Sequence, residues 1–298
     1  MRREKILFLL LGFLLSSGVA GLQAQVKTTE ELHWAGCGIT KKAFMTELAK
    51  AYTKKTGIKV DIKGGGATRG IRDAAAGKID IGGACRMTIE GNKLEADAYQ
   101  IPVAWDALVV IVNKNNPVTG ISFEQLQGIY LGKIKNWKVL GGADAPIELY
   151  IRKGKFSGVG RTLRELVFAN FDQEFVAKYT VKSSGPLEKG VLKNPNGIGV
   201  TGISSAKRRD VKILKLDGKY PDYENIKNGH YALYRPLYLV IEKSNRDQKV
   251  HDFIRYALSR EGQALIREQG TVPYSEAMGL VMKQLEQYQR ASQRGLYQ

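Results

Sequence analysis

The sequence predicts an α/β protein in which mostly parallel sheets enclose a ligand cleft. Segments with the apolar runs of buried strands alternate with segments whose apolar residues recur at helical spacing, which favours parallel sheets flanked by helices. Three times a glycine-rich loop follows a strand and leads into a helix. Ligands of such sheets bind beyond the carboxyl ends of the strands, where these loops gather. If two sheets face one another, the third loop lies opposite the first two and the loops enclose a cleft.

The N-terminal residues are typical of a secretory signal peptide. A basic lead at 1–5 precedes an apolar run at 6–15, and Ala20 and Ala24 offer small residues for cleavage. We place the cleavage after Ala24, with an uncleaved anchor as the alternative. The run is too short for a comfortable membrane span, and no other segment approaches the ~20 apolar residues that a span requires. We therefore expect an exported, periplasmic protein that is not integral to the membrane, with residues 1–24 removed.

Composition and charge narrow the class of protein. With 298 residues, 43% of them hydrophobic and 25% charged, the chain has the balance of a soluble globular protein of one or two domains. The formal net charge is +17, and removal of residues 1–24 leaves +15, which suits an anionic ligand. The lysines are scattered and form no basic run interleaved with aromatic residues, so we expect no nucleic-acid partner.

The first glycine loop, at 36–40, follows a short strand at 32–35. The helix after it has one apolar face and stops at Gly57. The glycine spacing is close to the dinucleotide-binding fingerprint, but Lys41 stands where the third glycine belongs, and no suitable ribose-binding acid clearly follows the next strand. We therefore discard the dinucleotide interpretation. The apolar face of this helix is formed by Phe44, Leu48, Ala51 and Tyr52.

The second glycine loop, at 63–70, joins a strand at 58–62 to a helix whose apolar face contains Ile71. Glycines let the backbone approach a ligand closely, and the first helical turn leaves N–H groups unpaired, so an anion is the favoured guest. Arg69 and Arg72 add positive charge there. The alternative is a tight strand-to-helix turn without a ligand.

The remaining elements continue the alternation of strands and helices. Two apolar runs, at 103–112 and 236–242, are typical of buried strands. A strand at 147–152 leads into the third glycine loop, at 157–161, and a helix with an apolar face follows. The tail from Met282 onward is polar and rich in glutamine, which predicts a frayed helix. The other expected elements are a helix containing Phe123, Leu126 and Ile129, a turn into a strand at 194–199, and C-terminal helices around 253–258 and 264–266.

Several motifs resemble those of the periplasmic solute-binding proteins of the phosphate type, which serve bacterial ABC importers. The likeness extends over about residues 32–279, nearly the whole mature chain. The run at 123–137, which ends in Lys135-Asn136-Trp137, looks like a signature of that family's second lobe. The other matching motifs are Gly64-Gly65-Gly66 with Gly70-Ile71, Lys78-Ile79-Asp80-Ile81-Gly82, Asn194-Pro195-Asn196-Gly197-Ile198-Gly199 and Tyr234-Arg235-Pro236-Leu237-Tyr238.

The resemblance implies the two-lobed periplasmic-binding-protein fold, with two mixed or parallel sheets flanked by helices and two crossover hinge strands. We assign the hinge strands to Val109–Val112 and Leu237–Ile241, about which the lobes would close on the ligand. Lobe 1 would then comprise residues 25–108 and 242–298. Lobe 2 would comprise residues 109–241, including the hinge strands.

The resemblance also implies a ligand, since the family binds a tetrahedral oxyanion with backbone amides, hydroxyls, an arginine and an aspartate that accepts the anion's own proton. Arg152 and Ser157 match the arginine and one hydroxyl. The aspartate position falls on Cys85, which removes a group that would repel a fully ionised anion. Another oxyanion therefore competes with phosphate as the expected ligand. The family's threonine falls on Val159 or Gly160, and its first-lobe hydroxyl positions fall near Gly38 and Ala67, with Thr40 and Thr68 as substitutes.

The predicted site combines amides of the three loops with nearby cations. An alternative is that Arg69, Arg72 and Arg86 point to solvent, so that only amides, Arg152 and Ser157 bind the anion. We predict no catalytic residue, no metal ligand and no cofactor. The predicted ligand-binding residues are Cys37, Gly38, Gly66, Ala67, Thr68, Arg69, Cys85, Arg86, Arg152, Ser157, Gly158, Val159, Gly160 and Arg161.

The two cysteines, Cys37 and Cys85, lie at predicted strand ends that the fold would bring close together. In an exported protein such a pair suggests a disulfide, and separately packed thiols are the first alternative. A second alternative is capture of a soft ligand such as a trivalent metalloid, since thiolates suit soft ions. His33 is a candidate to join them, although a lone histidine near a strand is more often structural. His230 and His251 show no metal-binding spacing.

We expect a monomeric solute-binding protein that captures phosphate or a related small inorganic oxyanion and hands it to an ABC permease. A second hypothesis is a cysteine-assisted oxyanion or metalloid sensor that feeds a signalling partner. A third is an exported enzyme that processes phosphoesters. The third is disfavoured because the sequence has no Gly-x-Ser-x-Gly elbow, histidine-rich metal cluster or Walker loop.

Overall fold

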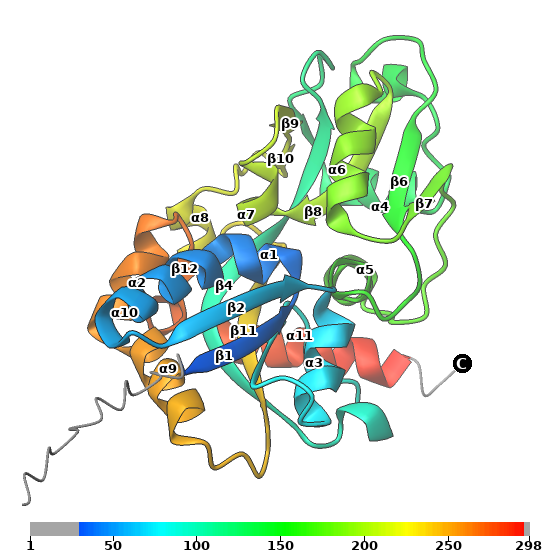
Figure 1. Cartoon of the computed structure of the whole chain (residues 1–298). Coiled ribbons are helices and arrows are strands. Elements are labelled where there is room, and N and C mark those ends of the chain that lie inside the picture. Colours follow the sequence, from blue (N-terminus) through cyan, green and yellow to red (C-terminus); the bar gives the residue numbers. More distant parts are fainter. Residues whose placement is uncertain (1–29, 295–298) are drawn as a thin grey trace, which may run out of the picture.

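The computed structural model describes residues 30–294, and the expected signal peptide at 1–24 lies outside the described residues. Figure 1 shows two lobes, each containing a sheet with helices packed against it, and strand β4 running from one lobe into the other. None of the helices within residues 30–294 combines the length and the apolar character that crossing a bilayer requires.

Three parallel strands form one side of the first lobe's sheet. β1 (Glu31–Gly36) pairs with both β2 (Lys59–Gly64) and β3 (Ile81–Ala84), so the spatial order is β2-β1-β3. Because the three strands are parallel, their carboxyl ends and the loops that follow them lie at one edge of the sheet. The helices that follow β1 and β2 are α1 (Gly38–Thr40), which continues through a π-helical turn (Lys41–Met45) into α2 (Thr46–Thr56), and α3 (Ala67–Ala75).

Strand β4 (Ala98–Asn113) belongs to both sheets. Its residues 98–107 pair in antiparallel fashion with β11 (Tyr234–Glu242), which in turn pairs with β3. Its residues 108–112 pair in antiparallel fashion with β8 (Gly197–Gly202) of the second lobe. One continuous strand therefore connects the two lobes.

The expected hinge strands occupy different sheets. Residues 109–112 pair with β8, within the second lobe. Residues 237–241 pair with β4 and residues 238–240 also pair with β3, so they lie within the first lobe's sheet and not between the lobes. The apolar run at 236–242 identified a buried strand, but its partners are set by long-range pairing that a run of this kind does not encode.

The second lobe is built on a mixed sheet. β6 (Glu148–Arg152) pairs in parallel with β8 on one side and with β7 (Tyr179–Val181) on the other. Because β6 and β7 are parallel, the segments that follow them leave the same edge of the sheet. The helices of this lobe are α4 (Phe123–Tyr130), α5 (Gly158–Leu163) with a π-helical turn after it (Arg164–Phe168), α6 (Ser184–Lys193) and α7 (Ile203–Ala206).

The remaining described elements are short strands and peripheral helices. The strands are β5 (Gly120–Ile121), β9 (Val211–Ile213), β10 (Lys215–Leu216) and β12 (Val272–Pro273). The helices are α8 (Tyr223–Lys227), α9 (Gln248–Leu258), α10 (Arg260–Glu268) and α11 (Leu280–Arg294), with short 3-10 turns at Lys93–Glu95, Trp137–Leu140 and Tyr274–Ala277.

The C-terminal tail forms a packed helix, α11, and not the frayed helix that its composition predicted. Gln284 and Ala291 are buried. The Tyr288 hydroxyl donates a hydrogen bond to the Thr88 carbonyl at 3.1 Å, and the Tyr288 ring lies 5.4 Å from that of Phe171, between ring centroids. The helix therefore contacts the first lobe through Thr88 and the second lobe through Phe171. Its buried residues are Leu280, Gln284 and Ala291, and a glutamine among so few buried positions leaves the hydrophobic periodicity too weak to reveal the packing.

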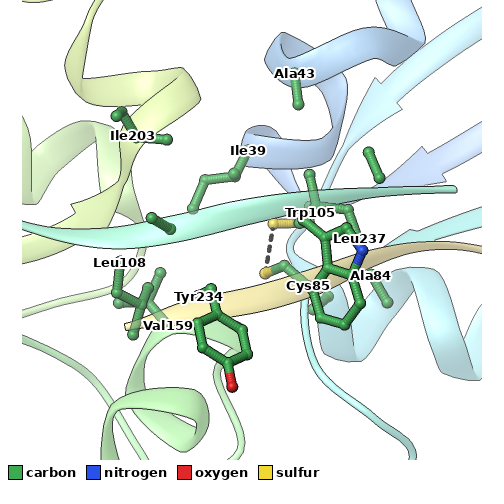
Figure 2. Packing of buried hydrophobic residues seen from close by; sticks show 14 of the residues in the cluster. Ile39, Ala43, Ala84, Cys85, Trp105, Leu108, Val159, Ile203, Tyr234 and Leu237 are labelled. Carbon is green, nitrogen blue, oxygen red and sulfur yellow. Dashed lines mark hydrogen bonds between the residues drawn. The ribbon is translucent and has the colours of Figure 1, made fainter. Parts of the chain in front are cut away.

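A continuous apolar core extends through the described part of both lobes. Trp105, on β4, is fully buried and stacks on Tyr274 with 5.0 Å between ring centroids. Figure 2 shows Trp105 close to Ala84 on β3, to Leu237 on β11 and to Cys85, which follows β3. Close packing of this kind resists deformation, so the strands hold the loops above them in fixed positions.

Candidate ligand-binding site

A cavity of about 430 Å³ lies between the two lobes. The first lobe contributes the ends of β1, β2 and β3 with the helical turns that follow, and the second lobe contributes segments after β6, β7 and β8. The volume suits a small ligand. The cavity is lined by Cys37, Gly38, Lys42, Gly64, Gly65, Gly66, Ala67, Cys85, Arg152, Gly158, Val159, Lys182, Ser183, Ser184, Gly185 and Ser205.

Four helix N-termini meet at this cavity. α1, α3, α5 and α6 begin at Gly38, Ala67, Gly158 and Ser184, and all four residues line it. The first-turn N–H groups of a helix have no acceptor within the helix. No side-chain cap is made at α1, α3 or α6, whereas Ser157 caps α5 by accepting a hydrogen bond from the Gly160 N–H at 3.1 Å. The cavity thus presents amide donors and the positive ends of helix dipoles, which favour an anion.

Two glycines make this convergence possible. Gly66 precedes α3 with φ of 86°, in the left-handed region that L-residues with a Cβ rarely adopt. A Cβ on Gly158 would lie 2.4 Å from the Cys85 sulfur and 3.1 Å from the Ala67 Cβ. The absence of a side chain at Gly158 therefore lets the start of α5, in the second lobe, come into contact with the first lobe.

Arg152 is a partly buried cation of the cavity lining whose hydrogen bonds go to neutral acceptors. Its Nη1 donates to the Ser184 hydroxyl at 3.0 Å and its Nη2 to the Lys182 carbonyl at 2.9 Å, both neutral acceptors. Its Nε is buried without a hydrogen-bond partner. Burial lowers the pKa of the Arg152 guanidinium, which stays charged because its ordinary pKa is so high.

Two lysines add positive charge to the cavity wall. Lys42 donates from Nζ to the Ser205 hydroxyl at 2.7 Å and lies 3.8 Å from the Glu188 carboxylate. Burial lowers the pKa of Lys42, and the Glu188 charge opposes that shift. Lys182 lines the cavity with an exposed side chain. None of the described lining residues is an aspartate or a glutamate.

The predicted arginines of the first lobe are not among the residues that line the cavity, and they have acidic partners. Arg86 is buried and donates from Nη2 and Nη1 to the two Glu95 carboxylate oxygens at 2.7 and 2.8 Å. Arg72 donates to the same carboxylate at 3.2 Å. Arg69 is exposed and pairs with Asp73 at 2.9 Å. The alternative interpretation placed Arg86 and Arg72 in solvent, but both guanidinium groups form ion pairs with Glu95.

Four further predicted residues also lie outside the cavity lining. The Thr68 hydroxyl donates to the Phe156 carbonyl at 2.8 Å, so it joins the first lobe to the loop before α5. Ser157 and Gly160 are engaged with each other in the cap of α5. Arg161 is buried with its guanidinium 3.6 Å from the Phe171 ring centre. The predicted residues that do line the cavity are Cys37, Gly38, Gly66, Ala67, Cys85, Arg152, Gly158 and Val159.

Several lining residues escaped the sequence prediction. The segment 182–185 spans the start of α6, and its two serines followed by Gly185 and a proline are a recognisable helix-start pattern that could have indicated it. Gly64 and Gly65 belong to the quoted glycine run but were not assigned to the site. Lys42 and Ser205 carry no local signal, because they meet only through tertiary packing across 163 residues of sequence.

The two cysteines lie in contact as free thiols. Their sulfurs are 2.9 Å apart, and Figure 2 marks the hydrogen bond between them. The pair is therefore neither a disulfide in this structure nor two separately packed thiols. His33 does not join them, since it is exposed and faces Asp80 at 3.2 Å. Within the part of the chain that the structure describes, no cluster of three or more His, Cys, Asp or Glu side chains is arranged to hold a metal ion.

The hydrogen bond between the thiols shifts the pKa values of the two cysteines in opposite directions. The bond from Cys85 lowers the pKa of Cys37, and the Arg235 charge and the Thr40 and Ile39 N–H groups act in the same direction against burial. The same bond, together with burial, raises the pKa of Cys85. Cys37 is consequently the more acidic thiol of the pair, and a thiolate at Cys37 could accept a hydrogen bond from the Cys85 thiol.

Known proteins share both the sequence and the fold. Residues 27–261 match the model of the PBP superfamily domain. A phosphate-binding protein PstS of Borreliella burgdorferi is 28% identical over 279 residues, which cover 90% of this chain and 98% of the relative. A putative phosphate ABC transporter substrate-binding protein from Clostridium perfringens, solved with bound phosphate, is 30% identical with a TM-score of 0.75 and covers 82% of this chain and 99% of its own.

A second solved structure gives the same result. The ABC-type phosphate transport receptor from Vibrio cholerae is 29% identical with a TM-score of 0.64, over 82% of this chain and all of its own. The expected two-lobed α/β fold is confirmed by these likenesses and by the sheet pairing. The chain belongs to the PBP superfamily, and among its relatives are phosphate-type solute-binding proteins of ABC transporters.

Proposed function

We propose that the protein captures phosphate or a closely related oxyanion in the cavity between its lobes and delivers it to an ABC importer. One observation carries the proposal: the described lining combines four helix N-termini with three cationic side chains and contains no carboxylate. Such a lining can replace the water around a small anion with fixed amide dipoles and charge-assisted hydrogen bonds. Relatives named as phosphate-binding proteins support phosphate as the anion.

Arg152 would supply the strongest single contact. Its guanidinium is already oriented by Ser184 and by the Lys182 carbonyl, so little side-chain entropy is lost when an anion binds. Its buried Nε lacks a partner, and an unsatisfied buried donor is costly until a ligand or water accepts from it. An oxyanion in the cavity would satisfy that donor and the charge together.

Selectivity among oxyanions follows from what the lining lacks. A carboxylate would repel a fully ionised anion and favour one that carries a proton, and the described lining has no carboxylate. The Cys37 thiolate is a weaker version of such a group. We therefore propose that the site distinguishes phosphate from sulfate less sharply than a site with a carboxylate would.

The proposal that the protein delivers the anion to a membrane partner is based on its similarity to solved relatives. The names of the relatives from Clostridium perfringens and Vibrio cholerae connect them to ABC transport. We propose the same partner, an ABC permease, for this protein. Export by cleavage after Ala24, action as a monomer and absence of enzymatic turnover complete the proposal.

Calorimetric titration of the purified protein with phosphate, arsenate, sulfate and molybdate tests the proposal. We expect saturable binding of phosphate at one site per chain, without turnover of a generic phosphoester. Arg152→Ala should remove most of the affinity, whereas Arg69→Ala is a matched control because Arg69 is exposed and paired with Asp73. If none of the four anions binds, or if the control loses as much affinity as Arg152→Ala, the proposed site is wrong.

A further inference from the structure

The only two cysteines of the chain share one wall of the anion cavity. Cys37 precedes α1 and Cys85 follows β3, and both line the cavity although they are 48 residues apart in sequence. Their sulfurs are 2.9 Å apart, and both are free. Small molecules that enter the cavity therefore reach a contacting pair of thiols.

The surroundings divide the two sulfurs into a nucleophile and a resolving group. Cys37 lies at the start of a helical segment, where the Ile39 and Thr40 N–H groups stabilise a thiolate. Cys85 is more deeply buried, and the hydrogen bond to Cys37 together with burial raises its pKa. The charged groups that face the pair are Arg235 and Asp106 from below, which pair with each other at 3.2 Å, and Lys42 and Arg152 from the two lobes.

We propose that Cys37 and Cys85 form a redox-active dithiol that a small disulfide oxidant converts to an intramolecular disulfide, and that this conversion strengthens anion binding in the cavity. The first half concerns the thiols alone. The second half rests on the proposed function, because it requires an anion in the same cavity.

The exchange balances without any further reactant. The Cys37 thiolate attacks one sulfur of the oxidant, which forms a mixed disulfide and releases the oxidant's other half as a thiolate. That thiolate takes the Cys85 proton. The Cys85 sulfur then attacks the Cys37 sulfur and releases the second half as a thiolate. The two protein sulfurs lose two electrons, and the oxidant's disulfide gains them.

The effect on the anion is electrostatic. In the dithiol form the Cys37 thiolate is the single negative side chain among the described residues that line the cavity. A disulfide carries no charge, so oxidation removes a repulsion toward any oxyanion. Since Arg235, Lys42 and Arg152 surround and screen the thiolate, we expect affinity for phosphate to rise about tenfold. By linkage, phosphate must favour the disulfide by the same factor, a shift of about 30 mV in the reduction potential.

The thiol half is tested without phosphate. The protein is equilibrated with hydroxyethyl disulfide and its reduced form, 2-mercaptoethanol, over a range of ratios, then analysed by intact mass and on a non-reducing gel. We expect a monomer that has lost two hydrogens, and no such species in Cys37→Ser or Cys85→Ser. A dithiol that persists at every ratio, or oxidation that gives only dimers or stable mixed disulfides, would overturn the proposal.

The anion half is tested by calorimetry on the separated forms at about pH 8, where the Cys37 thiolate is present. We expect phosphate to bind the disulfide form about tenfold more tightly than the dithiol form, and the midpoint of the redox titration to move by about 30 mV when phosphate is added. Equal affinities would overturn the coupling. If phosphate binds neither form while the disulfide still appears, the proposed function fails and the redox pair stands.

Discussion

The two lobes bring the same kind of loop to the cavity, but the arginines near these loops have acidic partners in the first lobe and neutral partners in the second. In the first lobe, the loop before α3 is followed by Arg69 and Arg72, which pair with Asp73 and Glu95. In the second lobe, Arg152 donates only to the Ser184 hydroxyl and a backbone carbonyl. Both lobes offer amides, the first lobe adds the thiols and Lys42, and the second lobe adds an arginine without an acidic partner. An arginine near a helix start adds less positive charge to a site when a carboxylate already pairs with it.

Glu95 is responsible for most of this difference. Burial by itself raises the pKa of Glu95, but hydrogen bonds from Arg86, the Arg86 charge, the Ile89 N–H and Arg72 together lower it, so the carboxylate is ionised. It holds Arg86 at 2.7 Å, and Arg86 Nε in turn donates to the Phe156 carbonyl of the second lobe at 3.0 Å. The first lobe uses its arginine as a structural link to the opposite loop.

The largest effect on stability is expected when the ion pair between Arg86 and Glu95 is broken. Glu95→Ala leaves the Arg86 guanidinium buried without a counter-charge, which should lower the free energy of unfolding by about 3–5 kcal/mol in a denaturant titration. Because the pKa of Glu95 is depressed in the folded state, its contribution is present above the unfolded pKa and is lost as pH falls through the folded pKa. The difference between wild type and variant should therefore shrink in acid. Arg72→Ala, which removes the half-buried partner, is the control and should cost under about 1 kcal/mol.

The second-largest effect tests the other arginine. Arg152→Ala should weaken phosphate binding by about 2–4 kcal/mol, measured by calorimetry, because a charge-assisted contact in a partly desolvated site is lost. Stability should change little, since the described hydrogen bonds of Arg152 go to neutral acceptors, the Ser184 hydroxyl and the Lys182 carbonyl. Arg152→Lys keeps the positive charge but loses the planar guanidinium, so its affinity for phosphate should lie between those of the wild type and Arg152→Ala. A loss below about threefold in Arg152→Ala would show that the anion does not contact this side chain.

This contrast also explains what the sequence could reveal. The fold was accessible because glycine loops, apolar runs and helix stops are local signals, and the three loops do converge on one cavity. Arg152 was found by resemblance. The pairing of Arg86 was missed because Glu95 lies nine residues further along in a short 3-10 turn, where nothing in the sequence marks it as buried. Lys42 and Ser205 were missed because only the packed structure brings them together.

Within the second lobe, we expect the exposed Lys182 to contribute less to phosphate affinity than the partly buried Arg152. Lys182 lines the cavity, but its side chain is exposed, so salt and water screen it. Lys182→Ala should weaken phosphate binding by about threefold at low ionic strength and less at 0.5 M salt or above, as a calorimetric series would show. Lys178→Ala is the matched control, because Lys178 is an exposed lysine of the same lobe that is paired with Glu148. An effect of Lys182→Ala that is independent of salt would indicate direct, desolvated contact with the anion.

The smallest change in phosphate affinity is expected for Arg69→Ala. Removal of its partner Asp73 should instead increase the affinity. Arg69 lies over Gly65, a lining residue, yet its guanidinium is held by Asp73, so Arg69→Ala should change phosphate affinity by less than about twofold. Asp73→Ala removes the neutralising carboxylate from an arginine that is already beside the cavity, and should tighten phosphate binding by about twofold at low ionic strength. The double variant, Asp73→Ala with Arg69→Ala, should return to the wild-type value in the same calorimetric assay. If Asp73→Ala has no effect while Arg69→Ala weakens binding, then the pairing seen for Arg69 does not keep it from the anion, and the two lobes differ less than their ion pairs indicate.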